Sequence, residues 1–298
     1  MPFVSRAPYL WKLRSRSIEL GRRTVLMGVL NVTPNSFSDG GRFQSASEAV
    51  EAALMMFDEG ADIVDVGGES TKPGVMAVSA DLEAERVLPV IDGILAHRAD
   101  ALLCIDTYKS ATARAAVDAG AEIVNDVSGM LWDAGMGATC ASLACGVVLM
   151  HTRGRPQEWR SQPRLPQSEV MPLVKLELAE RLASAVAAGI SAERVVLDPG
   201  FGFGKAYENN YPLLAHLDEL KSLRRPLMAG VSRKSFLAHT LAQRRGTSAS
   251  DIPMGERGNP SVAAMTGTIL AGAHIVRVHE VKAAVEAAAI ADEILNAV

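Results

Sequence analysis

Short runs rich in Val, Ile and Leu alternate with longer runs rich in Ala, Leu and Glu along almost the whole chain. The short apolar runs are typical of buried strands, and the longer runs, with apolar positions at helical spacing, are typical of helices. Eight strands are predicted, at residues 24–30, 62–66, 101–106, 122–125, 146–151, 194–198, 226–231 and 273–279. The helices predicted between them cover residues 47–59, 80–97, 110–119, 168–188, 211–222, 234–242 and 281–296.

Eight strand-then-helix units follow one another without a break in composition or a linker rich in Pro and Ser. This repetition favours an α/β fold with one closed (β/α)8 TIM barrel over a doubly wound sheet, within a single domain spanning residues 1–298. Residues 10–22 predict a short hairpin with its turn at Gly21-Arg22, placed to close the bottom of a barrel that runs from about residue 24 to 298. Residues 151–167 and 247–261 are predicted to be long loops, the second followed by a short helix to Leu270.

Polar side chains mark the point where most predicted strands end. They are Asn31, Asp65, Asp106, Asn125, His151, Asp198, Ser232, and Arg277 with His279. A polar residue is disfavoured inside a barrel strand, whereas the carboxyl ends of the strands surround the mouth where barrel enzymes carry their chemistry. We therefore expect these eight positions to be in phase and to meet at one rim.

Four segments near these strand ends suggest an anionic ligand. Residues 31–41 and 67–74 are rich in Gly, Ser and Thr, and such loops present backbone N–H groups and hydroxyls to phosphate oxygens. Residues 232–235 place Lys234 at a helix start, and Arg277 and His279 share one strand face by the period of two. No GxxxxGK[ST] pattern is present, so nucleotide hydrolysis is not supported.

Composition narrows the functional classes. The chain has 298 residues, of which 48% are hydrophobic and 21% charged, so it can bury a large core and global disorder is excluded. The net charge of −4 excludes a general coat for nucleic acid or for an anionic membrane. Three cysteines without CxxC spacing predict neither a disulfide framework nor a zinc site, and no apolar run is long enough for a membrane span. We therefore expect a reduced, cytoplasmic protein.

Seven segments together resemble the ordered motifs of the dihydropteroate synthase family of pterin-binding enzymes. They are MGVLNVTPNSFSDGG (27–41), DVGGESTKPG (65–74), IDTYK (105–109), IVNDVSG (123–129), LDPGFGFGK (197–205), VSRKS (231–235) and HIVRVHEV (274–281). The resemblance covers nearly the whole chain. It implies a (β/α)8 barrel and a transferase of folate biosynthesis, active as a homodimer.

The resemblance also implies the reaction. The enzyme condenses 6-hydroxymethyl-7,8-dihydropterin pyrophosphate with p-aminobenzoate, giving 7,8-dihydropteroate and pyrophosphate. Loss of pyrophosphate comes first and leaves a pterin methylene cation, which the aryl amine then attacks. An aniline-type nitrogen is uncharged at neutral pH, so this route needs positioning and charge stabilisation rather than a strong base.

Site residues are carried over from the matching motifs. The pterin would be lined by Asp106, Asn125, Asp198 and Lys234. The guanidinium of Arg277 would stack on the pterin and, with His279 and Asn31, contact the pyrophosphate. The p-aminobenzoate pocket would comprise Phe37, Thr71, Lys72, Pro73, Phe203 and Ser235, and Mg²⁺ on the pyrophosphate would be approached by Asn31 and Asp39. Asp106, Lys234, Arg277 and His279 would be the catalytic residues.

The chain departs from the family pattern at four places. Lys72 stands where Arg is usual and Asn35 where Asp is common, while residues 257–262 and the pair His151-Thr152 also differ. Lysine keeps the charge but loses the fork geometry of arginine. Two alternatives stay open: a methyltransferase that uses methyltetrahydrofolate and a corrinoid protein, and a non-catalytic pterin-binding paralogue. The residues Thr71, Lys234 and Arg277 count against the methyltransferase. Lys72, which replaces the usual arginine, leaves the non-catalytic paralogue open.

Overall fold

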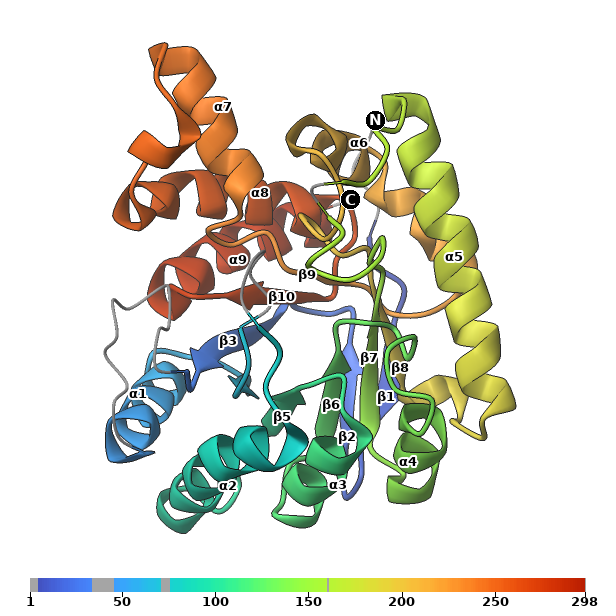
Figure 1. Ribbon diagram of the computed structural model, residues 1–298. Coiled ribbons are helices and arrows are strands. Elements are labelled where there is room, and N and C mark those ends of the chain that lie inside the picture. The colour runs from blue at the N-terminus through green and yellow to red at the C-terminus, as the bar shows by residue number, and fades with distance from the viewer. Residues whose placement is uncertain (1–4, 34–45, 71–75, 160, 298) are drawn as a thin grey trace.

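The computed structural model describes residues 5–33, 46–70, 76–159 and 161–297, and within them a parallel sheet curves into a barrel with helices outside it (Figure 1). The strand order is β8-β7-β6-β5-β4-β3-β10-β9, and a single parallel bridge between Leu197 and Leu227 joins the two ends of the sheet. The barrel strands are β3 (Val25–Asn31), β4 (Ile63–Gly67), β5 (Leu103–Asp106), β6 (Ile123–Asp126), β7 (Gly146–Met150), β8 (Val195–Asp198), β9 (Met228–Ala229) and β10 (Ile275–Val278). The predicted (β/α)8 barrel is confirmed.

Helices follow the strands and cover the outer face of the sheet. They are α1 (Ala46–Asp58), α2 (Ala80–His97), α3 (Ser110–Asp118), α4 (Met136–Leu143), α5 (Gln167–Ala187), α6 (Asn210–Ala215), α7 (Ser235–Arg245), α8 (Gly258–Leu270) and α9 (Val281–Asn296). Short 3₁₀ helices cover Ala192–Arg194, Tyr207–Asn209, Leu217–Leu223, Ala249–Asp251 and Met254–Arg257. Crossing a lipid bilayer would need a helix longer or more apolar than any in the described part of the chain.

The pleat of the strands divides the barrel interior into two layers. The lower layer is apolar and includes Met27, Ile63, Cys104, Ile123, Val148, Val196 and Ile275. Because side chains alternate between the two faces of a strand, the residue two positions further on also points inward. These upper residues include Asp65, Asp106, Asn125, Asp198 and Arg277. A single step of two residues therefore changes the interior from apolar to charged.

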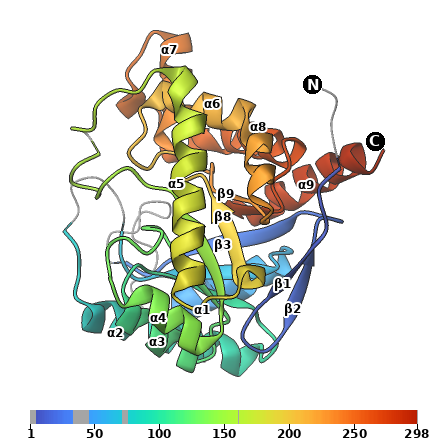
Figure 2. The ribbon, with the colours of Figure 1, turned by 90° about the vertical axis from the view of Figure 1, so that its right-hand side faces the viewer.

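An antiparallel hairpin of β1 (Tyr9–Lys12) and β2 (Ser17–Leu20) closes the lower end of the barrel (Figure 2). Trp11 and Leu20 join the lower apolar layer and are at most 2% exposed. Gly146 lies under the hairpin, and a Cβ at this position would come within 2.5 Å of Leu13 Cδ2. The predicted hairpin is therefore confirmed, and it acts as the bottom of the core.

The turn of this hairpin lies elsewhere than predicted. The backbone N–H of Leu13 donates to the carbonyl of Arg16, so the turn falls at residues 13–16 rather than at Gly21-Arg22. Gly21 instead ends the second strand, with φ at +116°. A Cβ there would lie 2.8 Å from the carbonyl oxygen of Ala7, which explains the glycine without a hairpin turn.

Three helical segments differ from the prediction. The predicted loop 247–261 contains the start of α8, which begins at Gly258 because Pro260 in a first helical turn loses no intrahelical bond. The predicted helix 211–222 divides into α6 and a 3₁₀ helix, where the buried Leu217 and Leu220 have the three-residue spacing of that form. Helix α4 was not predicted, since its small residues give little periodicity in composition.

Candidate active site

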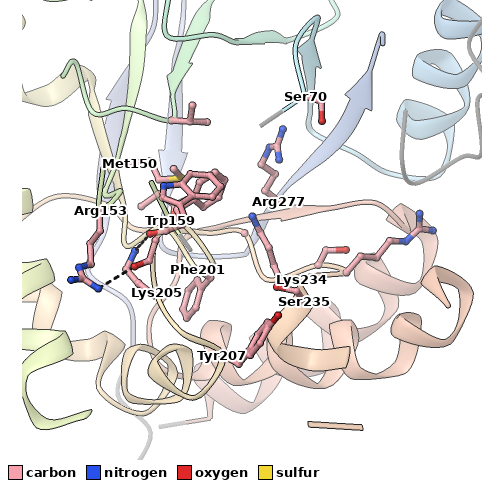
Figure 3. A pocket seen from close by; sticks show the side chains of 18 of the residues that line it. Ser70, Met150, Arg153, Trp159, Phe201, Lys205, Tyr207, Lys234, Ser235 and Arg277 are labelled. Atoms are coloured by element: carbon pink, nitrogen blue, oxygen red, sulfur yellow. Dashed lines mark hydrogen bonds between the residues drawn. The ribbon is translucent and has the colours of Figure 1, made fainter. Parts of the chain in front are cut away.

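A cavity of about 940 Å³ opens at the carboxyl ends of the barrel strands, which is within the usual size range of small-molecule sites. Its walls come from several strand ends and from the loops that follow β7 and β8. Figure 3 draws Ser70, Lys234 and Arg277 on one side of the cavity and Met150, Trp159 and Lys205 on the other. The cavity is the mouth of the barrel.

Arg277 is fixed in this mouth by two carboxylates from neighbouring strands. Its Nε donates to Asp65 Oδ2 at 2.6 Å and its Nη2 donates to Asp106 Oδ2 at 2.7 Å. Burial acts to lower the pKa of Arg277, but the charges of Asp65 and Asp106 outweigh it and raise that pKa. The guanidinium is therefore permanently charged, and its plane is set by the two strands that hold the carboxylates.

Asn125 and Asp65 lie beneath the cavity and leave hydrogen-bonding capacity unused. Asn125 Nδ2 donates to Asp65 Oδ2 at 2.9 Å. Asp65 Oδ1 and Asn125 Oδ1 are buried and have no hydrogen-bond partner among the described residues. Buried polar atoms are rarely left unpaired. These two acceptors therefore lack a protein partner among the described residues, although neither residue lines the cavity itself.

Asp198 supplies a further acceptor at the end of β8. Its Oδ1 accepts a hydrogen bond from the backbone N–H of Gly200 at 2.7 Å, which fixes the carboxylate. Burial raises the pKa of Asp198, while the Gly200 N–H and the nearby Lys234 act in the opposite direction. Asp198 and Asn125 thus offer carboxylate and amide oxygens close to one buried surface.

Lys234 is the N-cap residue of α7 and extends into the cavity, with its Nζ 3.9 Å from the centre of the Phe203 ring. Burial, together with the positive charge of Arg277, lowers the pKa of Lys234 to about 8, despite the opposing charges of Asp198 and Asp106. Burial likewise raises the pKa of Asp106 to about 7, although Arg277 acts to lower it. Lys234 and Asp106 therefore both change their protonation state near neutral pH.

His279 contacts Ser232 across the ends of two strands. The ring Nδ1 lies 3.0 Å from Ser232 Oγ, and the backbone N–H of His279 donates to the same oxygen at 3.3 Å. Burial, followed by the charges of Arg233, Arg277 and Lys234, lowers the pKa of His279 well below its usual value. When Ser232 donates its proton to Nδ1, the neutral ring carries its own proton on Nε2 and can donate it to an anion.

Most predicted site residues in the described part of the chain line the cavity. They are Asn31, Asp106, Asp198, Phe203, Lys234, Ser235, Arg277 and His279. Asn125 belongs to the same upper layer and contacts Asp65, but it does not line the cavity. The predicted contacts Phe37, Asp39, Thr71, Lys72 and Pro73 lie outside the described residues, as does Asn35.

His151 does not belong to the rim, which corrects the expectation of eight residues in phase. Val148 and Met150 point into the barrel, so His151 points outward, toward α5. Its Nε2 lies 3.1 Å from Glu177 Oε2 without forming a hydrogen bond, and the side chain is fully buried. Met150 takes the place in the cavity that we expected for His151. The period of two, counted from Val148, would have shown this.

Lys205 is a cavity residue that the sequence did not single out. Its Nζ donates to the carbonyls of Gly200, Phe203 and His151 at 2.7, 3.2 and 3.4 Å. The ammonium thus ties the turn after β8 to the end of β7. No sequence signal marks it, because a lysine after a glycine-rich turn is ordinarily solvated.

Trp159, in the loop after β7, also lines the cavity and was not predicted. Its ring meets the Phe203 ring edge to face, with centroids 5.1 Å apart, and its Nε1 donates to the carbonyl of Gly154. Lys234 lies over the same Phe203 ring. Together they form an apolar wall with a cation beside it, which suits an aromatic ligand that bears a negative charge.

A metal ion would find few protein ligands here. Within the described ranges no three His, Cys, Asp or Glu side chains are grouped as a metal site. Asn31, half-buried at the end of β3, offers an amide oxygen to the cavity. Such a donor fits Mg²⁺ that arrives on phosphate oxygens and keeps most of its water, and it does not fit an all-protein cage.

Sequence and structure comparisons identify the family of the chain. A family model described as pterin binding enzyme matches residues 27–279. The dihydropteroate synthase of Escherichia coli K12 is 40% identical over 272 residues, covering 91% of this chain and 92% of that protein.

Two solved structures of Xanthomonas albilineans dihydropteroate synthase are also similar. The one with 4-aminobenzoic acid has a TM-score of 0.85 at 39% identity and covers 98% of this chain and 100% of that one. The one in complex with 7,8-dihydropteroate has a TM-score of 0.79 at 38% identity and covers 94% and 97%. The chain therefore belongs to the pterin-binding enzyme family, among relatives that are dihydropteroate synthases.

Proposed function

We propose that this chain is a transferase that condenses 6-hydroxymethyl-7,8-dihydropterin pyrophosphate with p-aminobenzoate, giving 7,8-dihydropteroate and pyrophosphate. The observation that carries the proposal is a cavity that has the carboxylate of Asp198 and the cations Arg277 and Lys234 in its lining, with the unpaired Oδ1 of Asn125 in the layer of side chains beneath it. A flat heterocycle with N–H groups fits the acceptors, and an anionic tail fits the cations. Relatives that hold 4-aminobenzoic acid and 7,8-dihydropteroate support both halves of the reaction.

The pterin binds by its polar edge. Asp198 accepts N–H groups of the amino-pyrimidine ring, and Asn125 Oδ1 accepts another, since its own amide N–H already donates to Asp65. Lys234 donates to the opposite edge of the ring, near O4 and N5. Because Arg277 is held in plane by two carboxylates, its guanidinium offers a fixed face against which the pterin stacks.

Departure of the diphosphate is the step that needs most stabilisation. The C–O bond to the diphosphate breaks, the electron pair leaves on oxygen, and the methylene carbon becomes cationic. Arg277 stabilises the departing anion by charge, and neutral His279 donates a hydrogen bond to it. Asn31, with Asp39, would hold Mg²⁺ on the diphosphate. When bound, the ion neutralises charge on the departing group.

The arylamine then attacks the methylene carbon with its nitrogen lone pair and releases a proton to water. Phe203 and Trp159 hold its ring, and Ser235 offers a hydroxyl to its carboxylate. Ionised Asp106 faces the cationic carbon and lowers its energy. Thr71, Lys72 and Pro73 complete the p-aminobenzoate pocket by the family pattern. Lys72 supplies the charge that arginine usually gives there.

The test mixes the purified protein with Mg²⁺, pterin pyrophosphate and radiolabelled p-aminobenzoate and measures labelled dihydropteroate. Lys234→Ala is expected to lower kcat/KM by about 10²–10³-fold, as removal of a fixed charge donor does elsewhere. Lys12→Ala, at the opposite end of the barrel, serves as the matched lysine control and is expected to have no effect. Pterin binding without product would favour a non-catalytic paralogue, and corrinoid-dependent methyl transfer would favour the methyltransferase.

The family resemblance also supports a homodimer in the cytoplasm. Light scattering on the purified protein tests the homodimer, and the expected mass is twice the chain mass of 31.6 kDa. Fractionation of the producing cells tests the cytoplasmic location. A monomer with full activity would remove the homodimer from the proposal without affecting the reaction.

A further inference from the structure

The turn that carries Lys234 has an unfavourable backbone. The N–H of Lys234 donates to the carbonyl of Val231 at 3.3 Å, so residues 231–234 form a four-residue turn. Arg233, its third residue, has φ at +57°, in the left-handed region where turns of this kind usually carry glycine. An arginine at such a position is strained and persists only when its surroundings hold it.

Three side chains from other segments hold Arg233. Ser261 Oγ accepts the backbone N–H of Arg233 at 2.8 Å, and Arg257 Nη1 donates to the Arg233 carbonyl at 3.3 Å. Glu280 Oε1 accepts from Arg233 Nε at 3.0 Å and from Nη2 at 2.7 Å. The backbone N–H, the carbonyl and the guanidinium of Arg233 are therefore each hydrogen-bonded. Their partners come from α8, from the 3₁₀ helix before it, and from the residue that precedes α9.

Two of the three holding residues, Ser261 and Arg257, are also tied to their own surroundings. Ser261 Oγ donates to the Arg257 carbonyl at 2.5 Å, and Arg257 Nη2 donates to the carbonyl of Ile252 at 3.0 Å. Ser261 is 4% exposed. The group thus forms a connected network beside the cavity, in which Arg257, left without a role by the sequence, joins two segments to the turn.

Both ends of the turn lead to the site. Lys234 is the N-cap residue of α7 and places its ammonium in the cavity beside Phe203. Ser232, on the other side of Arg233, has its hydroxyl against the ring of His279. A rotation about the backbone of Arg233 would therefore displace Lys234 and break the contact that orients His279.

We propose that Ser261, Arg257 and Glu280 are positioning residues which hold Arg233 in its left-handed form, and so fix Lys234 on the pterin and His279 on the diphosphate together. The inference rests on the proposed function. Ser261 and Glu280 do not line the cavity, so their effect passes through the Val231–Lys234 turn, whereas Arg257 also lines the cavity and is therefore left out of the test.

The test compares Ser261→Ala and Glu280→Gln with Glu256→Gln. Glu256 lies one residue from Arg257 in an exposed ion pair with Arg245 and does not contact the turn, so it is the matched control. We expect the first two variants to lower kcat/KM for the pterin substrate roughly tenfold, within the loss of up to about 10²-fold that small misplacements cause. The control is expected to match the unaltered protein.

A pH profile separates positioning from a general loss of structure. Lys234 faces Arg277, Asp198 and Asp106, and its low pKa of about 8 depends first on burial. If the turn relaxes and Lys234 moves toward solvent, its pKa rises, and the basic limb of kcat/KM moves to higher pH. A merely structural role would lower the active fraction and leave KM and this limb unchanged, which would overturn the proposal.

A second pair of variants tests the strain directly. Arg233→Gly and Arg233→Ala both remove the bond to Glu280, but only glycine adopts a positive φ without a penalty. We expect the glycine variant to bind pterin pyrophosphate about fivefold more tightly than the alanine variant, measured by calorimetry. Equal affinities would overturn the proposal. Because this readout is binding, it stays informative if the unaltered protein binds pterin but forms no dihydropteroate, which would reject the proposed reaction alone.

Discussion

The two inward-facing layers of the barrel differ sharply although they lie only two residues apart on the same strands. Ile63 and Cys104 are apolar and fully buried, while Asp65 and Asp106, next on the same strands and the same face, hold Arg277. The hairpin closes the lower layer, whereas the upper layer opens into a cavity. Adjacent layers of one sheet therefore separate the stabilising part of the core from the part that binds.

The contrast has an energetic meaning. The lower layer gains stability from buried apolar surface in proportion to its area. The upper layer instead holds charges away from water, and their desolvation is offset only where partners are well placed, as Asp65 and Asp106 are for Arg277. Atoms such as Asn125 Oδ1 have no hydrogen-bond partner among the residues that the structure describes. The upper layer thus gives up stability to keep groups available for substrate.

The largest expected effect comes from Arg277→Met, which tests whether the upper layer contributes to stability as well as to the reaction. The change removes the cationic wall and leaves two carboxylates without their partner. We expect dihydropteroate formation to fall by about 10²–10³-fold. The free energy of unfolding should fall by about 3–5 kcal/mol, as when one partner of a buried ion pair is removed. Denaturant unfolding and the product assay measure the two.

Unaltered stability in that variant would mean that Asp65 and Asp106 take up protons in place of the ion pair. Adding Asp65→Asn to the Met variant is the control, since it removes one of the two unpaired carboxylates. Recovery of stability in the double variant, with activity still lost, would locate the destabilisation in the orphaned charges.

Trp11→Ala makes the complementary change in the lower layer. The Trp11 ring is fully buried under the barrel, and its Nε1 donates to the carbonyl of Arg194 at 2.7 Å. Truncating a buried aromatic side chain is expected to lower the free energy of unfolding by about 3–5 kcal/mol. At a temperature where the variant stays folded, kcat/KM should match the unaltered protein. A change in KM would show that the two layers are coupled rather than separate.

The pH dependence of kcat/KM tests the charges of the upper layer. Asp106 has a pKa of about 7, so its ionised form disappears as the pH falls. Lys234 has a pKa of about 8, so its protonated form disappears as the pH rises. The rate should therefore pass through a narrow maximum between pH 7 and 8 and fall about tenfold for each pH unit on either side. Lys234→Arg keeps its charge and should remove the basic limb alone.

The same shift predicts the sign of a stability change. Because the pKa of Asp106 is raised in the folded protein, the folded state binds this proton more tightly than the unfolded state. Its contribution to the free energy of unfolding therefore grows as the pH falls from about 7 toward 4, and is lost again as the pH rises through 7. Asp106→Asn should flatten the stability profile in this window.

Alternation along the strands explains which parts of the site could be foreseen from the sequence. The apolar run that ends in Asp106 or Asp198 predicts a barrel strand and also shows which residue lies at its rim. Both conclusions follow from the two-residue alternation of side chains along a strand. The roles of Ser261 and Arg257 could not be foreseen, since they depend on segments brought together only by the closed sheet. The prediction missed the start of α8 because glycine and proline, here Gly258 and Pro260, are common in loops. Only packing decides whether such a segment is a helix or a loop.

The smallest expected effect concerns His151. We expected it at the rim because it is a polar residue at a strand end, but the pleat of the strand turns its side chain toward α5. Both ring nitrogens are buried and form no hydrogen bond within the described part of the chain. His151→Met should therefore leave kcat/KM within about twofold, and should leave the free energy of unfolding unchanged or raise it by about 1 kcal/mol, because an unpaired polar group is removed.

Met150→Ala is the matched change one residue earlier on the same strand. Met150 lines the cavity, so we expect this variant to raise KM for the pterin substrate while His151→Met does not. The opposite result, with activity lost at His151 and kept at Met150, would mean that the strand is shifted by one residue. A one-residue shift exchanges the two faces of a strand, so this pair measures the register of β7 and with it which of its last residues faces the cavity.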